Sequence, residues 1–149
     1  AGGIPGLRTA IEDREGNLWL GSQWEGVTRL SDSWTRRYSL AEGLNDRIVW
    51  SVSPDPRGDG LWVGGNDGLS YLQGGRLRLV VPGAALPHPN AYNLLAERDR
   101  VWIGTRGGLR VLDLTTPNAA PRALPELAEI GGSQVNAIRR GADGDLWIG

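Results

Sequence analysis

The stretch Leu18-Trp19-Leu20-Gly21 decides the fold, because close copies of it return three times along the 149-residue chain. The copies are LWVG at 61–64, VWIG at 101–104 and LWIG at 146–149. Their tryptophans are separated by 43, 40 and 45 positions. Self-similarity at one period of this length indicates one structural unit that is used several times.

Two further markers accompany the tetrapeptide in a fixed order. A Gly-Val or Gly-Leu pair follows each complete copy, at 26–27, 68–69 and 108–109. A turn rich in Asp and Gly precedes it at 13–17, 55–60 and 143–145, and the third copy shortens this turn to 97–100. Asp, Asn and Gly are typical of tight hairpin turns, since they tolerate positive φ.

Each period predicts four short strands. In the first period we expect them at 8–13, 18–22, 27–32 and 34–40, and in the second at 48–53, 61–64, 69–73 and 77–81. The third predicts 92–97, 101–105, 109–114 and a weak strand at 122–124 crowded by Pro121 and Pro125, then a helical turn at 125–130. The fourth predicts 135–139 and 146–149. The second strand of each period is apolar at nearly every position, which indicates burial on both faces.

Four antiparallel strands per period, each set stacked between two others, describe the blades of a β-propeller. We therefore expect an all-β fold, a β-propeller fragment of about three and a half four-stranded antiparallel blades over 1–149. The blades are expected at about 4–47, 48–90 and 91–133, with a half blade at 134–149. Because the sequence stops inside a repeated motif, we expect a piece of a longer chain whose remaining propeller blades are its partners. Alone, it is expected to expose an apolar flank and to self-associate.

The composition excludes several classes of protein. With 23 Gly and 9 Pro, the chain is interrupted too often for a helical bundle. The net charge of −1 and the absence of long basic runs speak against nucleic acid as a partner. There is no Cys, which removes disulfides and thiol catalysis, and no apolar run approaches the length that spans a membrane.

The chemistry-bearing residues are few, so we expect no catalytic residue, no metal site and no cofactor. The only histidine, His88, lies between two prolines, and no nucleophile motif accompanies it. The segment 143–145 has too few oxygen ligands for a calcium loop. The repeated tryptophans predict packing between blades rather than sugar platforms, and these structural residues are Trp19, Trp62, Trp102 and Trp147.

Strand order predicts where a ligand would bind. In an up-and-down blade, the loops after the second and fourth strands emerge at one end, and these loops hold the most varied polar residues. An aromatic group among amide, acid and Arg groups suits a small polar or carbohydrate-like ligand. Trp24 is the most informative residue, because an exposed indole is costly unless it packs or binds something. The candidate ligand-binding residues are Gln23, Trp24, Glu25, Asn45, Asp46, Arg47, Asn66, Asp67, His88, Asn90 and Arg106.

The string D-x-x-G-N-L-W-L-G-S, with its copies and the segment AEGLNDRIV at 41–49, resembles the two-component regulator propeller repeat. The resemblance implies a ligand-sensing propeller in the periplasmic part of a bacterial inner-membrane receptor, joined to a histidine kinase or diguanylate cyclase that this sequence does not contain. One alternative is a propeller enzyme like the streptogramin lyases, which would need a catalytic His beside a metal-binding acid. Another is a protein-interaction scaffold of the WD-repeat kind, whose Gly-His and Trp-Asp dipeptides are absent.

Overall fold

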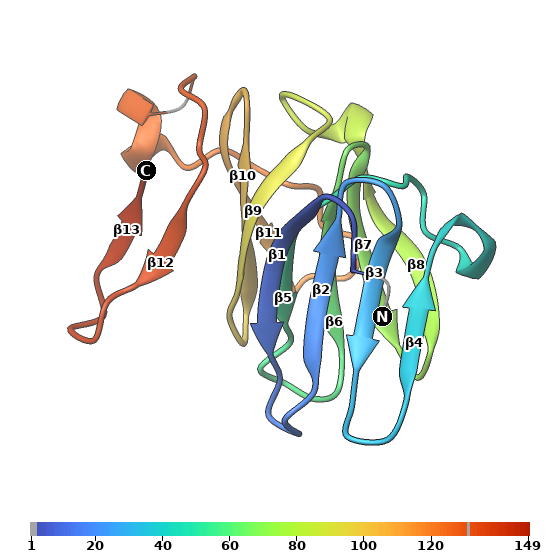
Figure 1. The fold of residues 1–149 in the computed structure, drawn as a ribbon. Coiled ribbons are helices and arrows are strands. Elements are labelled where there is room, and N and C mark those ends of the chain that lie inside the picture. The colour runs from blue at the N-terminus through green and yellow to red at the C-terminus, as the bar shows by residue number, and fades with distance from the viewer. Residues whose placement is uncertain (1–2, 131) are drawn as a thin grey trace.

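The computed structural model describes residues 3–130 and 132–149 and contains no α-helix among them. Its strands form four antiparallel sheets, which stand side by side (Figure 1). Blade 1 is β1 (Leu7–Glu12), β2 (Leu18–Ser22), β3 (Gly26–Leu30) and β4 (Thr35–Tyr38). Blade 2 is β5 (Val49–Pro54), β6 (Leu61–Gly65), β7 (Gly68–Gln73) and β8 (Arg76–Pro82). Blade 3 is β9 (Ala91–Ala96), β10 (Arg100–Thr105) and β11 (Gly108–Asp113), and the half blade is β12 (Ile138–Arg140) and β13 (Leu146–Ile148). The predicted propeller fragment is confirmed.

Short 3₁₀ turns lie in the segments that join the blades, where Gly and Pro interrupt the chain too often for longer helices. They are η1 (Leu40–Glu42), η2 (Gly83–Ala85) and η3 (Pro125–Ile130). The predicted helical turn at 125–130 is therefore confirmed. The weak strand predicted at 122–124 is reduced to one bridge between Val111 and Arg122, since the flanking prolines cannot extend the ladder.

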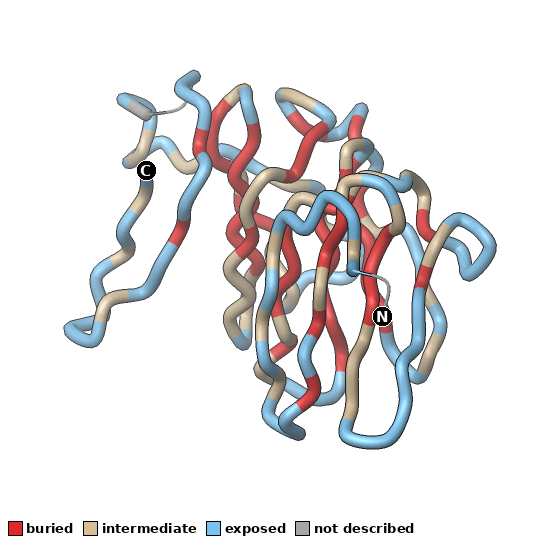
Figure 2. The backbone as a smooth tube through the Cα atoms, in the orientation of Figure 1, coloured by how far each residue is buried: buried red, intermediate tan, exposed pale blue. Residues whose placement is uncertain are grey.

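Successive positions of the tryptophan strand face two different blades. In β6, Leu61 and Val63 pack with Trp19 in the core between blades 1 and 2, while Trp62 packs in the core between blades 2 and 3. The same alternation holds in β10, where Trp102 faces the half blade. Burial on both faces, the prediction from the apolar run, is confirmed for these central strands (Figure 2).

The glycine that ends each of the first three tetrapeptides makes room for a residue at or shortly before the first strand of the next blade. A Cβ added at Gly21 would lie 2.8 Å from a methyl group of Val49, and one at Gly104 would lie 2.8 Å from a methyl group of Val135. Gly64 meets Ala91 in the same way, with 3.2 Å between the Cβ atoms. A side chain at these glycines would push neighbouring blades apart, so close stacking requires glycine.

The prediction that Trp147 belongs to the core is wrong, since its side chain is 65 % exposed. Trp147 lies between Leu146 and Ile148, which pack against blade 3, so its own side chain is on the opposite face. No described sheet covers that face. Leu18 on β2 is 42 % exposed because it lies on the outer face of blade 1, away from blade 2. The apolar flanks expected from the sequence are therefore present, whereas self-association stays a prediction.

An acidic residue at the end of the innermost strand fixes the buried aromatic side chain of its blade. The indole nitrogen of Trp19 donates to Asp13 at 2.7 Å, and that of Trp102 donates to Glu97 at 2.9 Å. Blade 2 uses a different arrangement, in which the Tyr71 hydroxyl donates to the buried carboxylate of Asp55 at 2.8 Å. From the sequence, these acidic residues were expected only to form hairpin turns, and their hydrogen bonds to buried aromatic side chains were not predicted.

Arg57 completes the blade 2 arrangement, with a guanidinium nitrogen 2.6 Å from Asp55. Burial acts to raise the pKa of the Asp55 carboxyl, but hydrogen bonds from Arg57 and Tyr71 outweigh it and hold the pKa below its ordinary value of 3.8. Burial, together with the bond to Asp55, raises the pKa of Tyr71 to about 12. The Asp55 carboxylate therefore stabilises the fold in its ionised form.

We expect Asp55→Asn to lower the free energy of unfolding by about 1–3 kcal/mol at neutral pH, because the buried Tyr71 hydroxyl loses its charged acceptor. A lowered pKa in the folded state gives stability that is present above the ordinary pKa and is lost as the pH falls through the folded value. Urea melts should therefore show that the free energies of unfolding of the variant and of the unaltered chain become similar as the pH is lowered from about 6 to about 2. A constant difference across that range would contradict this role.

Candidate functional site: the loops after the second and fourth strands

The loops that hold the candidate residues meet at one end of the blades, as strand order predicts. In blade 1, the amide of Gly26 donates to the carbonyl of Arg47 at 3.1 Å. In blade 2, the amide of Gly68 donates in the same way to Pro89 at 2.8 Å. Each bond joins the start of the third strand to the loop that follows the fourth, so the two loops form one surface, the loop end.

A hollow of about 320 Å³ lies at the loop end of blade 1. It brings together three of the predicted residues, Trp24, Glu25 and Arg47. Trp24 is 59 % exposed, and Leu40 beside it is 46 % exposed. The remaining lining residues are Gly26, Ser39 and Ala41. We call this set the Trp24 hollow.

The wall of the Trp24 hollow is held by a short capped turn. Ser39 and Glu42 form a reciprocal capping box around η1, and Gly43 ends the turn in the left-handed conformation with φ 97°. This holds the exposed Leu40 in the lining of the hollow. Glu25 is held by an ion pair of 2.9 Å with Arg37, while no ion pair is formed by Arg47 among the described residues. The hollow therefore presents an indole, an aliphatic side chain and a cation without an acid partner.

Four other candidates are used to join neighbouring blades. The Asn45 side chain donates to the carbonyl of Asp67 and accepts from the Ser70 hydroxyl at 2.9 Å. Asn90 donates to the side-chain oxygen of Asn66 across the same kind of boundary. These bonds link loops of successive blades and satisfy the amide groups internally. We therefore assign Asn45, Asn66, Asp67 and Asn90 to the scaffold of the loop end.

The last four candidates do not line the hollow. Asp46 caps its own loop by accepting from the amide of Ile48 at 2.7 Å. His88 accepts from the amide of Asn90 at 3.4 Å, so the histidine packs on its own loop. The Arg106 guanidinium is 3.5 Å from Gln134, and Gln23 accepts from Arg8. The structure does not bring these residues to one place.

Sequence reasoning missed a row of side chains on the innermost strands. The guanidinium of Arg8 on β1 lies 4.9 Å above the Trp50 ring on β5, and the ring of Tyr92 on β9 meets Trp50 edge-on at 4.8 Å. Arg8, Trp50 and Tyr92 are each the unpaired residue of a β-bulge, where the pairing between the first and second strands of the blade shifts register. Arg8, Trp50 and Tyr92 are spaced by 42 residues in the sequence, and this spacing could have predicted that they occupy equivalent positions in successive blades.

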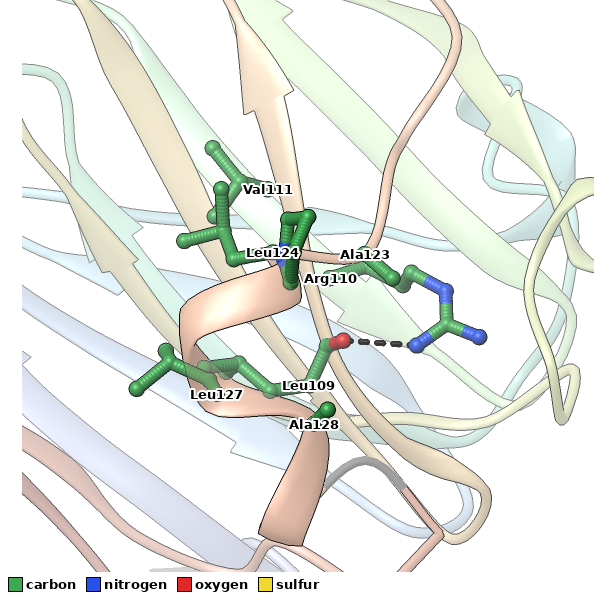
Figure 3. A pocket seen from close by; sticks show the side chains of 8 residues that line it. Leu109, Arg110, Val111, Ala123, Leu124, Leu127 and Ala128 are labelled. Carbon is green, nitrogen blue, oxygen red and sulfur yellow. Dashed lines mark hydrogen bonds between the residues drawn. The ribbon is translucent and has the colours of Figure 1, made fainter.

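A second hollow, of about 300 Å³, lies beside η3, where blade 3 has no fourth strand (Figure 3). Leu109, Val111, Leu124 and Leu127 give it an apolar lining. The Arg110 side chain turns back and donates to the carbonyl of Leu109 at 2.7 Å (Figure 3). Because the lining is mostly apolar and its charged member, Arg110, is bonded to a backbone carbonyl, the hollow suits packing more than recognition of a polar ligand.

Within residues 3–130 and 132–149, no group of three or more His, Cys, Asp or Glu side chains is placed to hold a metal ion. The same part of the chain has no helix with the length and apolar character that crossing a bilayer requires.

Comparison with known proteins identifies the fold. No protein-family model matches the sequence, and no curated protein matches it. Among solved structures, the chain is similar to the extracellular domain of BT3049 from B. thetaiotaomicron, described as a hybrid two component system, with a TM-score of 0.79 and 23 % identity. That match covers 96 % of this chain and 21 % of the other.

Two structures of the extracellular domain of BT4673 from the same organism are also similar. One, described as a one component system, has a TM-score of 0.77, 20 % identity and coverage of 97 % of this chain and 20 % of the other. The second, described as a hybrid two component system, has a TM-score of 0.73, 16 % identity and coverage of 96 % and 19 %. The chain thus spans about one fifth of the length of the structures it matches, and the likeness establishes its fold.

Proposed function

We propose that this chain is a segment of a ligand-sensing propeller in the periplasmic part of a bacterial signal-transduction receptor. In this role it binds and does not catalyse. The observation that carries the proposal is the structural likeness over 96 % of the chain to the extracellular domain described as part of a hybrid two component system. The repeat pattern in the sequence supports the same assignment independently of that comparison.

The Trp24 hollow is the proposed ligand site within this segment. An exposed indole beside Leu40 supplies an apolar platform for a ring, and Arg47 supplies donors for its polar substituents. The proposed ligand is a small polar, carbohydrate-like molecule. Blades that continue the stack on the exposed sides of Leu18 and Trp147 are the proposed partners, since they would remove both apolar flanks from water.

The receptor assignment is tested by the reading frame that encodes this segment. We expect a membrane-spanning segment followed by a histidine kinase or a diguanylate cyclase domain. A reading frame that encodes only propeller blades and a hydrolase or lyase signature would contradict the assignment.

We expect a neutral disaccharide to bind in the Trp24 hollow, with maltose, lactose and sucrose as the probes. The indole N–H signal of Trp24 should shift in ¹⁵N NMR titrations with at least one of them. Trp24→Ala and Arg47→Gln should each weaken that binding by about tenfold, the effect of removing a central contact of 1.4 kcal/mol. Arg98→Gln removes an exposed guanidinium on blade 3 and serves as the charge-matched control. Equal affinities in all variants, or no response to any probe, would remove the hollow as the site.

A further inference from the structure

A cleft of about 380 Å³ opens between blades 1 and 2 at the end opposite the Trp24 hollow. Blade 1 contributes its face toward blade 2, including Trp19 and Tyr38, and blade 2 contributes the hairpin turn at Gly74 and Gly75. Trp34, which is 44 % exposed, stands at the rim of the cleft in the turn between β3 and β4.

Two arginines occupy opposed positions on this face. Pairing places Arg29 on β3 directly opposite Trp19 on β2 and directly opposite Arg36 on β4. Like charges in directly opposed positions repel each other and weaken a sheet. Among the described residues, no acid lies within ion-pair distance of either guanidinium. Neither guanidinium is therefore neutralised by a carboxylate of the described chain.

Aromatic rings hold both arginines in place. The guanidinium of Arg29 lies between two indoles, 5.3 Å from the ring centre of Trp19 and 4.9 Å from that of Trp34. Arg36 lies 5.1 Å above the ring of Tyr38. Stacking of this kind fixes the planar group and leaves its in-plane N–H donors free. The Nε atom of Arg29 is buried and has no hydrogen-bond acceptor, which is unfavourable unless a ligand supplies one.

The other blades show that the fold does not require an arginine here. The position of Arg29 opposite the repeated tryptophan is Tyr71 in blade 2 and Val111 in blade 3. Tyr71 is satisfied within its blade by Asp55, at 2.8 Å. Among the three described blades that have a third strand, blade 1 alone carries a charged group with unused donors at this position.

Acid oxygens line the inner end of the cleft, at the turns that contain Asp13, Glu15 and Asp59. The Asp13 carboxylate is already used by the Trp19 indole, the Asn17 side chain and two backbone amides. The acceptors that face a ligand are therefore Glu15 and Asp59, and Asp59 also accepts from Gln73 at 3.1 Å. A simple anion would be repelled by this end of the cleft. A ligand with hydroxyl groups as well as an anionic group would find acceptors here and donors at the arginines.

We infer that this cleft binds an acidic saccharide. Its carboxylate or sulfate accepts from Arg29 and Arg36, its ring lies against the exposed part of Trp34, and its hydroxyl groups donate to the acids at the inner end. The inference concerns a separate site at the opposite end of the blades, and it does not depend on the Trp24 hollow.

The test is calorimetric titration of the whole chain with sodium glucuronate, sodium sulfate and glucose. Glucuronate combines the ring, the hydroxyl groups and the anion, whereas each of the other probes lacks one part. Glucuronate should bind at least about tenfold more tightly than sulfate or glucose, and Arg36→Gln should weaken its binding by about tenfold or more. Arg98→Gln, with the same change of charge, should bind like the unaltered chain.

A second variant guards against a folding defect. Trp34→Ala changes an exposed side chain and should also weaken glucuronate binding, with a cooperative melt retained. Sulfate binding as tight as glucuronate would overturn the inference, as would unchanged affinity in Arg36→Gln or no binding of glucuronate. The proposal for the Trp24 hollow is tested with neutral sugars and with other variants. A negative result at one site therefore does not affect the proposal for the other site.

Discussion

Trp62→Ala should lower the free energy of unfolding by about 3–5 kcal/mol, the usual cost of truncating a large core aromatic. The Trp62 side chain is 2 % exposed and packs in the core between blades 2 and 3. Its ring lies 4.5 Å from that of Tyr71, so the truncation also removes an aromatic contact. Urea melts followed by circular dichroism measure the change.

The repeat supplies a matched control for this substitution. Trp147→Ala alters the same position of the tetrapeptide, but the side chain there is 65 % exposed, so the loss should stay below about 1 kcal/mol. Similar losses for the two variants would contradict the stacking of alternate positions against different blades.

Gly68→Ala should lower the free energy of unfolding by about 2–5 kcal/mol, although it adds only one methyl group. Gly68 has φ 100°, a backbone conformation that costs an alanine about 1–2 kcal/mol. The added Cβ would also overlap the carbonyl oxygen of Val81 and lie 2.8 Å from the amide nitrogen of Gly83, which adds about 1–3 kcal/mol of overpacking. The glycine is thus required by the turn between β6 and β7.

Gly58→Ala is the control, because Gly58 lies in an exposed turn with no atom within 4 Å of an added Cβ. Its free energy of unfolding should stay within about 0.5 kcal/mol of the unaltered chain. Equal effects at the two glycines would show that crowding at Gly68 is relieved by a small shift of the loop.

The repeat made most of the fold predictable from the sequence. The predicted strands at 18–22 and 101–105 coincide with β2 and β10 to within one residue, because apolar runs between Gly and Asp turns leave little freedom. The role of Trp147 could not be predicted in the same way. A motif records which side chains are apolar, but burial depends on whether another sheet covers that face.

The candidate site was predictable only in part. The sequence placed eleven residues at one end of the blades, and the structure gathers Trp24, Glu25 and Arg47 there. Asn45 and Asn90 have the same polar character, yet their amides bond across blade boundaries. The juxtaposition of Arg29 with Arg36 depends on strand register, which the repeat pattern alone does not specify.

The stacking of blades through alternate positions of the tryptophan strand is tested most directly by the seven indole N–H signals in ¹⁵N NMR. Single Trp→Phe variants assign them, and a soluble gadolinium agent then reports the exposure of each. We expect Trp19, Trp62 and Trp102 to keep their signals, because their side chains are at most 6 % exposed. Those of Trp24, Trp34 and Trp147 should broaden first, because these side chains are 44–65 % exposed. Broadening of Trp62 and Trp102 together with Trp147 would contradict the propeller stacking.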